Sequence, residues 1–164
     1  MEILDLYDID GNKIGKTIVR GKERPAANEY IKLCVVYIKC QGKYLYQKCS
    51  VAKGGQYAVT GGHVPSGVGS KEQVVVEVQE ELVLDIDIDK LKLLGHIVRD
   101  IALFDIYYYE DDSIMDYHFT LQESEVESVQ WYTKPEIEHL ISSGLMRESS
   151  AIHYSKFIKD SKEY

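Results

Sequence analysis

Three glutamates near the middle of the chain have the spacing at which carboxylates can act together. In the stretch S-K-E-Q-V-V-V-E-V-Q-E-E-L, Glu77, Glu80 and Glu81 stand at positions i, i+3 and i+4, which share one face of an α-helix. Like charges at these spacings destabilise a helix, and no lysine or arginine follows one turn later to relieve them. Carboxylate clusters suit hard cations such as Mg²⁺. The alternative interpretation is a solvated helix face.

The residues around the glutamates predict the helix that must position them. Ser70 is a plausible N-cap, with Gln73 in the capping-box position three residues later. The helix is expected to run from Lys71 to Leu82, with one side facing a core through Val75, Val78 and Leu82. Gly61 and Gly62 precede it in a loop whose backbone could approach the same ion.

Beyond this helix, the pattern along the chain predicts one α+β domain with a mixed sheet. Asp10-Gly11 is a strong hairpin signal within residues 2–20. β-branched and aromatic runs predict further strands at 31–38, 43–48, 57–60, 92–98, 102–109, 115–121 and 128–132. Thr133 and Pro135 are suited to start a helix that ends at Gly144. A last helix, about 148–160, is expected to turn one side inward through Ile152, Phe157 and Ile158.

The segment from Gly62 to Leu84 resembles the signature box of the Nudix hydrolases, G-x5-E-x7-R-E-U-x-E-E-x-G-U with U aliphatic. Gly62 opens the box, and its later positions are matched by Glu77, Val78, Glu80, Glu81 and Leu84. The opening L-Y-D-I-D-G-N-K-I-G-K-T and the late V-E-S-V-Q-W-Y-T-K-P-E-I resemble one Nudix branch. That branch is similar in its N-terminal hairpin to isopentenyl-diphosphate isomerases. The likeness extends from about residue 4 to residue 141.

The resemblance implies a fold, an activity and a cofactor. It implies a Nudix-type α/β/α sandwich as a single domain over residues 1–164, with the box at about 62–84. The implied activity is hydrolysis of a nucleoside diphosphate linked to another moiety, or of a related organic pyrophosphate. The implied cofactor is Mg²⁺ or Mn²⁺, held by Glu77, Glu80, Glu81 and the Gly61 carbonyl. Glu77 and Glu81 are the catalytic candidates, with Glu77 the first choice of general base.

Three valines depart from the box. Val68, Val76 and Val83 stand where the family has glutamate, arginine and glycine. The glutamate and the arginine help to orient the catalytic carboxylates in the family, so their loss predicts slow turnover. We expect Val68 and Val76 to lie near one another as an apolar pair; if they touch, Val76→Arg alone should destabilise the fold. Cys49 also stands where many relatives have an arginine available to phosphate.

The remaining candidates are individually weaker. Substrate contacts are assigned to a group of five residues, namely Gly62, His63, Lys48, Arg99 and Glu127. In other Nudix enzymes a base or an extra ligand comes from a loop outside the box, for which the candidates here are Glu123, Glu125 and Glu127. Lys53 could also contact phosphate, whereas His96 and His118 alternate within expected strands and are assigned structural roles.

Composition restricts partners and compartment. A formal net charge of −8 disfavours a broad surface for a nucleic acid polymer. The N-terminus lacks a signal-peptide pattern, and no apolar run is long enough for a membrane span. Cys34, Cys40 and Cys49 have no metal-site spacing and are expected to be buried reduced thiols. We therefore expect a cytoplasmic protein with a small nucleotide or pyrophosphate substrate, and the resemblance allows a homodimer.

Two other functions compete with hydrolysis. A Nudix-fold module that binds a nucleotide or a protein without turnover would explain the three valines, but not the retention of three mutually repelling glutamates. Isopentenyl-diphosphate isomerase activity would need a reactive cysteine in the strand before the box. The corresponding stretch Y-A-V-T-G-G-H contains none, so this alternative ranks below the other two.

Overall fold

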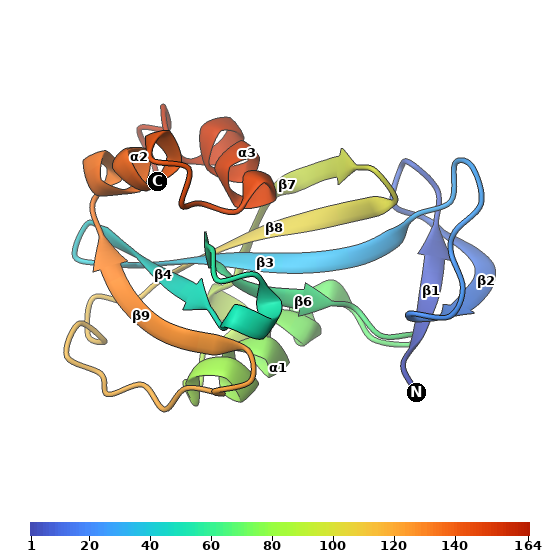
Figure 1. Ribbon diagram of the computed structural model, residues 1–164, viewed down its shortest axis with the longest axis horizontal. Coiled ribbons are helices and arrows are strands. Elements are labelled where there is room, and N and C mark those ends of the chain that lie inside the picture. The colour runs from blue at the N-terminus through green and yellow to red at the C-terminus, as the bar shows by residue number, and fades with distance from the viewer.

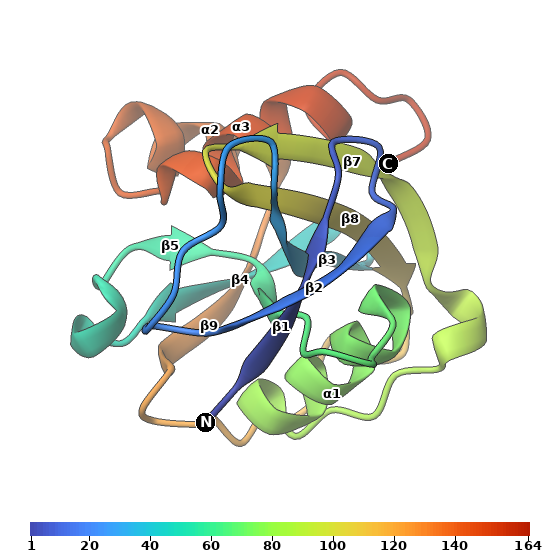
Figure 2. The same cartoon turned by 90° about the vertical axis from the view of Figure 1, so that its right-hand side faces the viewer.

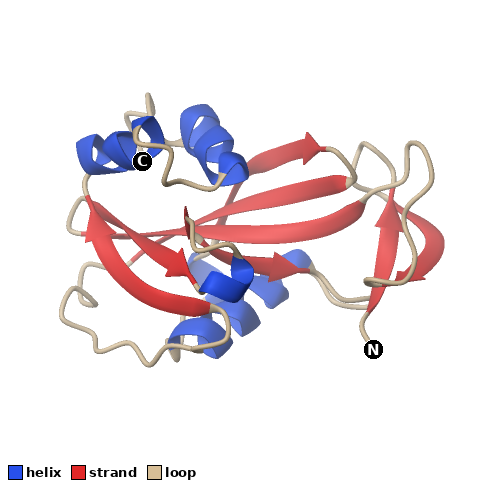
Figure 3. Ribbon diagram, in the orientation of Figure 1, coloured by secondary structure: helices blue, strands red, loops and turns tan.

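Nine strands and three α-helices follow one another along the chain, and the computed structural model describes all of residues 1–164. The strands are β1 (Ile3–Tyr7), β2 (Lys13–Val19), β3 (Ile31–Cys40), β4 (Lys43–Cys49), β5 (Tyr57–Ala58), β6 (Thr60–His63), β7 (Lys92–Arg99), β8 (Ala102–Glu110) and β9 (Val126–Tyr132). The helices are α1 (Ser70–Leu82), α2 (Lys134–Ser142) and α3 (Glu148–Phe157), with short 3-10 turns at Val51–Lys53 and Ile88–Lys90. Figure 3 shows the strands between the helices.

Strand β3 organises the main sheet. It runs parallel to β8 and antiparallel to β4 and β6, so the seven-stranded sheet is mixed. The strand order is β5-β4-β3-β8-β7, with β6 paired to β3 and β9 paired to β4. Its sequence I-K-L-C-V-V-Y-I-K-C is rich in the β-branched and aromatic residues that favour strands. Strands β1 and β2 form a separate pair beyond one end of this sheet (Figure 1).

Helices cover both faces of the main sheet. Successive side chains of a strand point to opposite faces, and β3 divides its side chains accordingly. Cys34 and Val36 pack in a core cluster with α1, whereas Tyr37 packs in a second cluster with α2 and α3. Figures 1 and 2 show α1 on one side of the sheet and α2 and α3 on the other. The architecture is the expected α/β/α sandwich.

The hairpin predicted at Asp10-Gly11 is present between β1 and β2. The Asp8 carboxylate accepts hydrogen bonds from the backbone N–H groups of Asp10 and Asn12, at 3.0 and 2.9 Å. Gly11 has φ +85°, a left-handed conformation that glycine adopts without a Cβ penalty. The local turn chemistry therefore determines this element.

The strand expected at 115–121 does not form. These residues belong to an irregular segment between β8 and β9. The backbone N–H groups of Thr120 and Gln122 donate to the carbonyls of Leu82 and Glu81 at the end of α1. Met115, Phe119 and Leu121 pack against the core, so the alternation of apolar residues correctly indicates burial. The backbone, however, pairs with the end of a helix instead of a strand.

The start of α1 also differs from the expectation. Gly69 is the N-cap, and Ser70 is the first helical residue. The Ser70 hydroxyl donates to Asp105 on β8 at 2.5 Å and is therefore engaged with the sheet. The inward side of the helix is made by Val74, Val78 and Leu82, while Val75 is only partly buried against the same core.

The two C-terminal helices cover the second face of the sheet. Thr133 caps α2 in a capping box with Glu136, as the sequence suggested for its cap. Helix α3 ends at Phe157, three residues before the expected end. Ile152 is exposed, which contradicts its predicted inward position, whereas Ile158 is buried. Phe157 packs against the second core cluster, as predicted. The buried residues within α3 are Ser149, Ser150, His153 and Tyr154.

The three cysteines are buried and unpaired, as expected. No helix has both the length and the apolar character needed to cross a bilayer.

Candidate active site

Helix α1 places the three glutamates at different depths in the wall of a polar cleft. Glu81 is 5 % exposed, Glu77 is half-buried and Glu80 is exposed. All three line a hollow of about 210 Å³ that contains no hydrophobic residue. Glu125, from the segment before β9, lines the same hollow. The helix and a distant loop thus bring carboxylates together.

Strand β6 passes directly beside these carboxylates. A Cβ at Gly62 would overlap the Glu77 carboxylate, and a Cβ at Gly61 would overlap the carbonyl of Cys34 on β3. Both positions need glycine because of this close approach. The glycine pair therefore allows the strand to contact both the sheet and the helix, and it leaves backbone polar groups next to the glutamates.

Glu77 is held by a neutral side chain. Gln73, one turn earlier in α1, donates from Nε2 to Glu77 Oε1 at 2.8 Å. Burial raises the pKa of Glu77, the Gln73 hydrogen bond lowers it, and the neighbouring charge of Glu80 raises it, with a net increase. An uncharged amide thus orients this carboxylate.

Val68 and Val76, which were expected to form an apolar pair, differ in their environments. Val68 packs against the core cluster beneath α1. Val76 is 41 % exposed and is not among the side chains packed on that cluster. The position where the family has an arginine therefore faces solvent, where an arginine would also be accommodated.

Glu81 is the most perturbed acid of the cleft. Burial, followed by the charge of Glu77, raises the pKa of Glu81 to about 8. Its Oε2 atom is buried and has no hydrogen-bond partner. A buried carboxylate oxygen without a donor is costly, and a bound cation is one of the partners that would satisfy it.

The donor set matches a hard cation, although no group of three or more His, Cys, Asp or Glu side chains converges as a metal-binding cluster. The carboxylates of Glu77 and Glu81 lie in one cleft beside the Gly61–Gly62 backbone, and one oxygen of Glu81 lacks a partner. Mg²⁺ usually keeps several waters and takes one or two protein carboxylates together with substrate phosphates. The residues present therefore fit a divalent cation whose coordination the substrate would complete.

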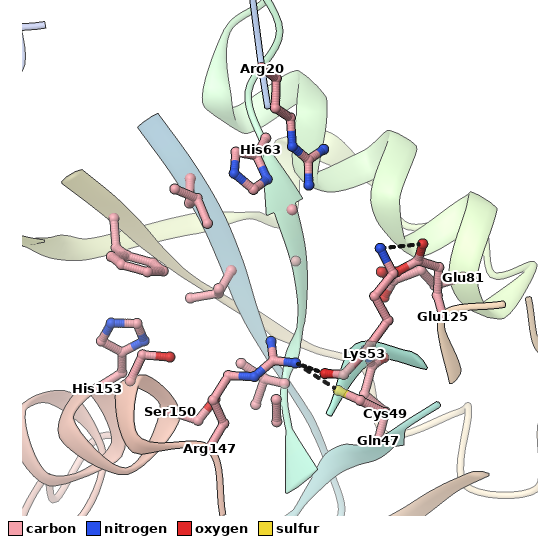
Figure 4. A pocket seen from close by; sticks show the side chains of 18 residues that line it. Arg20, Gln47, Cys49, Lys53, His63, Glu81, Glu125, Arg147, Ser150 and His153 are labelled. Atoms are coloured by element: carbon pink, nitrogen blue, oxygen red, sulfur yellow. Dashed lines mark hydrogen bonds and ion pairs between the residues drawn. The ribbon is translucent and has the colours of Figure 1, made fainter. Parts of the chain in front are cut away.

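Three cations face the carboxylates. Arg20, from the end of the β1–β2 hairpin, pairs with Glu2 at 2.7 Å, and Lys53 pairs with Glu125 at 3.2 Å. Arg147 has no carboxylate partner: its Nη2 atom lies 3.3 Å from Cys49 Sγ and 3.2 Å from the Lys53 carbonyl oxygen. Figure 4 shows its guanidinium directed toward Cys49, between His153 on one side and Glu81 on the other.

His63 lines the cleft from the end of β6. Burial, followed by the nearby charge of Arg20, lowers the pKa of His63 to about 4. The imidazole is therefore neutral at pH 7, so it can contact a phosphate through a hydrogen bond but not as a cation.

The structure gathers some of the predicted site residues and separates others. Those that line the cleft are Gly61, Gly62, His63, Glu77, Glu80, Glu81, Lys53 and Glu125. Lys48 and Glu127 instead pair with each other at 3.1 Å, and Arg99 pairs with Glu148 at 2.6 Å. These three residues do not line the cleft, so its geometry gives no support to their assignment to substrate contacts.

The two histidines assigned to strands differ from each other. His96 lies on β7, with its Nδ1 atom 2.6 Å from the buried Asp105 carboxylate. His118 is exposed in the irregular segment, which contradicts its expected strand position.

Arg20 and Arg147 line the cleft and Gln73 contacts Glu77, which the sequence alone did not indicate. Arg20 and Arg147 stand more than 100 residues apart and belong to no spaced motif. Gln73 was assigned to the helix cap because its spacing from Ser70 suggests one. The one available signal was the position of Gln73 one turn before Glu77, at which side chains on a helix meet.

A sequence relative decides the family. A protein of Listeria monocytogenes described as the uncharacterized Nudix hydrolase lmo0368 is 31% identical over 150 residues, which cover 88% of this chain and 87% of that protein. This chain belongs to the Nudix hydrolase family. No protein-family model matches the sequence. The particular likeness of the N-terminal hairpin to isopentenyl-diphosphate isomerases stays a prediction.

Solved structures share the fold of this Nudix hydrolase. DR0079 from Deinococcus radiodurans superposes with a TM-score of 0.78 at 19% identity, covering 96% of this chain and 99% of that one. The MutT protein of Methanosarcina mazei gives a TM-score of 0.65 at 16% identity, covering 81% and 96%. A bifunctional NMN adenylyltransferase/ADP ribose pyrophosphatase of Francisella tularensis, complexed with AMP and a Mn ion, gives 0.61 at 11% identity, covering 84% of this chain and 42% of that one.

Proposed function

We propose that this Nudix hydrolase cleaves the pyrophosphate linkage of a nucleoside diphosphate joined to another moiety, or of a related organic pyrophosphate, with Mg²⁺ or Mn²⁺ as cofactor. The observation that carries the proposal is the buried Glu81 oxygen without a donor, in a cleft lined also by Glu77 and by Arg147, which has no carboxylate partner. Family membership and the carboxylate donor set support the same reaction class.

Glu77, Glu80, Glu81 and the Gly61 carbonyl are the groups that would hold the cation. Glu81 has the unpartnered oxygen, and the exposed Glu80 lines the same hollow. A bound divalent cation would polarise the phosphoryl group and lower the pKa of the attacking water. Occupation by a cation would also relieve the repulsion between the glutamates.

Glu77 and Glu81 are the proposed catalytic carboxylates. Glu77 would take the proton of the attacking water as general base, because Gln73 fixes its orientation and burial raises its pKa. Glu125 is the alternative base from outside the box, since it alone of the three loop glutamates reaches the cleft. Its pairing with Lys53 would have to be broken for that role.

Arg147 is the proposed main phosphate contact. A guanidinium presents a fork of donors that matches phosphate oxygens, and Arg147 is the cation of the cleft without a carboxylate partner. It lies against Cys49, the position at which the resemblance pointed to an arginine in many relatives. Residues 1–164 act as one unit in this proposal, since the N-terminal hairpin and the segment before α3 both contribute cations to one cleft.

The proposal is tested by a hydrolysis screen of nucleotide sugars, dinucleotides, nucleoside triphosphates and coenzymes with Mg²⁺ or Mn²⁺. We expect metal-dependent release of a phosphate monoester, and loss of about 100-fold or more in Glu81→Gln. Glu72→Gln is the matched control, because Glu72 is an exposed glutamate in the first turn of the same helix and does not line the cleft.

The competing function is a binding module. It is favoured by the exposed Val76 and by the neutral Gln73, since together they leave Glu77 without a cationic partner. Tight binding of a nucleotide with no turnover of any compound in the screen would establish that function instead. Equal loss of activity in Glu72→Gln and Glu81→Gln would overturn the site assignment.

A further inference from the structure

The cleft continues past Arg147 to a second end of different character. This second end is a hollow of about 180 Å³, and Gly61, Gly62 and Glu81 line both it and the hollow that contains the glutamates of α1. Its far side is formed by apolar side chains from β3 and β8 and by polar ones from α3, namely Leu33, Val35, Phe104, Ser149, Ser150 and His153. In Figure 4, His153 and Ser150 lie on the opposite side of the view from Glu81 and Glu125.

His153 is a buried side chain with an unsatisfied nitrogen. It is 1 % exposed, it lines the hollow, and its Nδ1 atom is buried without a hydrogen-bond partner. Burial, together with the nearby charge of Arg99, lowers the pKa of His153 to about 4. The neutral imidazole has one donor and one acceptor nitrogen. An unpaired buried polar atom is destabilising, and a bound group with a complementary atom would satisfy it.

The ring of His153 packs against an aromatic neighbour. Its centroid lies 4.7 Å from that of Phe104, with the two planes inclined at 60°. Phe104 and Val35 add apolar surface to the same hollow. Ligand pockets commonly combine apolar walls with a few placed polar groups that fix orientation, and this end of the cleft has that composition.

The amino end of α3 adds a feature that suits a phosphate beside this hollow. Arg147 is the N-cap, and no side chain caps the helix. The first hydrogen bond of the helix is donated by the Ala151 amide to the Arg147 carbonyl, so earlier amides of the first turn have no intrahelical acceptor. Free amides at a helix N-terminus favour an anion, and Arg147, Ser149 and Ser150 line the same hollow.

We propose that this end of the cleft binds the organic group of the substrate: an uncharged ring with hydrogen-bonding atoms, which His153 recognises while Arg147 holds the adjoining phosphate. The inference rests on the proposed function for the position of the phosphates. In this proposal, residues of α3, which lies outside the box, determine which organic group the substrate can have. A nucleobase and a sugar both have the required chemistry.

Binding measurements in the presence of a chelator test the inference without any turnover. The probes are the four common ribonucleoside 5′-monophosphates, ribose 5-phosphate and inorganic pyrophosphate. We expect the ring-bearing probes to shift the ¹⁵N signals of the His153 imidazole and pyrophosphate to leave them in place. A response to the nucleotides alone identifies the ring as the base, and an equal response to ribose 5-phosphate identifies it as the sugar.

Two variants separate recognition from folding. His153→Phe retains an aromatic ring and removes Nδ1, and it should weaken the ring-bearing probe about tenfold while pyrophosphate binding stays unchanged. His118→Ala is the control, since His118 is exposed and does not line the hollow. Equal weakening of all probes, or His153 signals that respond to none of them, would overturn the inference. Normal probe binding without hydrolysis of any substrate would instead count against the proposed function alone.

Discussion

Gln73 donates a hydrogen bond from Nε2 to Oε1 of Glu77 over 2.8 Å, one helical turn away. The amide is buried, so the bond is protected from competing water. It is the one side-chain hydrogen bond to Glu77 in the structure. The neutral Gln73 thus supports the carboxylate in a helix whose arginine position is an exposed valine.

The first prediction concerns this hydrogen bond. Gln73→Leu keeps a similar volume but frees the Glu77 carboxylate to rotate. We expect kcat to fall roughly tenfold with little change in KM, because orientation of the base matters mainly in the transition state. Steady-state kinetics on the substrate found in the screen would measure both constants.

Gln79→Leu is the matched control for this variant. Gln79 lies on the same helix and also donates to a carboxylate, Asp85, at 2.8 Å, but it is exposed and does not line the cleft. The hydrogen bond of Gln73 would have no special function if the two variants lost the same activity.

The second prediction concerns Val83, which ends α1 in a left-handed conformation. Its φ and ψ are 51° and 46°, a region that is unfavourable for a β-branched residue. Val83→Gly should raise the free energy of unfolding by about 1 kcal/mol, because the Cβ penalty outweighs the greater entropy of unfolded glycine. Thermal denaturation would show a rise in Tm of about 2–4 °C.

Val76→Gly provides the comparison for Val83→Gly. Val76 is also exposed, but it lies inside the helix, where glycine lowers stability by up to about 1 kcal/mol. Opposite signs for the two substitutions are expected. A decrease in Tm for both would mean that the backbone at Val83 is not strained.

Local patterns predicted most of the fold. The hairpin at Asp10-Gly11 and the cap at Thr133 depend on residues within one turn of each other, and both are present. The long buried run of β3 was recognisable from its composition alone. The prediction of a strand at 115–121 was wrong, because the alternation of apolar and polar residues there reflects packing against the core. Its backbone partners lie at the end of α1, which no local pattern reveals.

The site was predictable only where its residues share one element. The glutamates of α1 and the glycines of β6 belong to one continuous stretch, and they line one cleft. Arg20 and Arg147 come from segments that meet only after the hairpin and α3 have packed around the sheet. The sequence around His153 contains no motif that marks it as a site residue. In the structure it packs against Phe104 of β8. Such long-range contacts require the structure.

The third prediction reverses the expectation that Val76→Arg would destabilise the fold. Val76 is 41 % exposed, so an arginine there can extend into solvent and approach Glu80 one turn later. We expect a change in the free energy of unfolding within about 0.5 kcal/mol, measured by urea denaturation. Val74→Arg is the contrasting variant: Val74 is buried in the core, so a charge there should cost several kcal/mol or prevent folding.

The fourth prediction concerns the stability of the metal-free protein as a function of pH. The pKa of Glu81 is about 8 in the folded state, whereas an unfolded glutamate titrates near 4.3. Between these values the folded protein holds a proton that the unfolded chain has lost, so stability falls as the pH rises through this window. The slope from this group approaches about 1.4 kcal/mol per pH unit.

Urea denaturation of the chelated protein from pH 5 to pH 8 would measure this slope, and Glu81→Gln should remove most of it. A glutamine stays neutral throughout the range, so the variant is expected to be more stable than the wild type at pH 8 and similar to it at pH 5. Glu72→Gln, at an exposed position of the same helix, should keep the wild-type slope. Parallel pH profiles for all three proteins would show that Glu81 is not a buried acid with a raised pKa, and would remove the main physical support for a cation at this position.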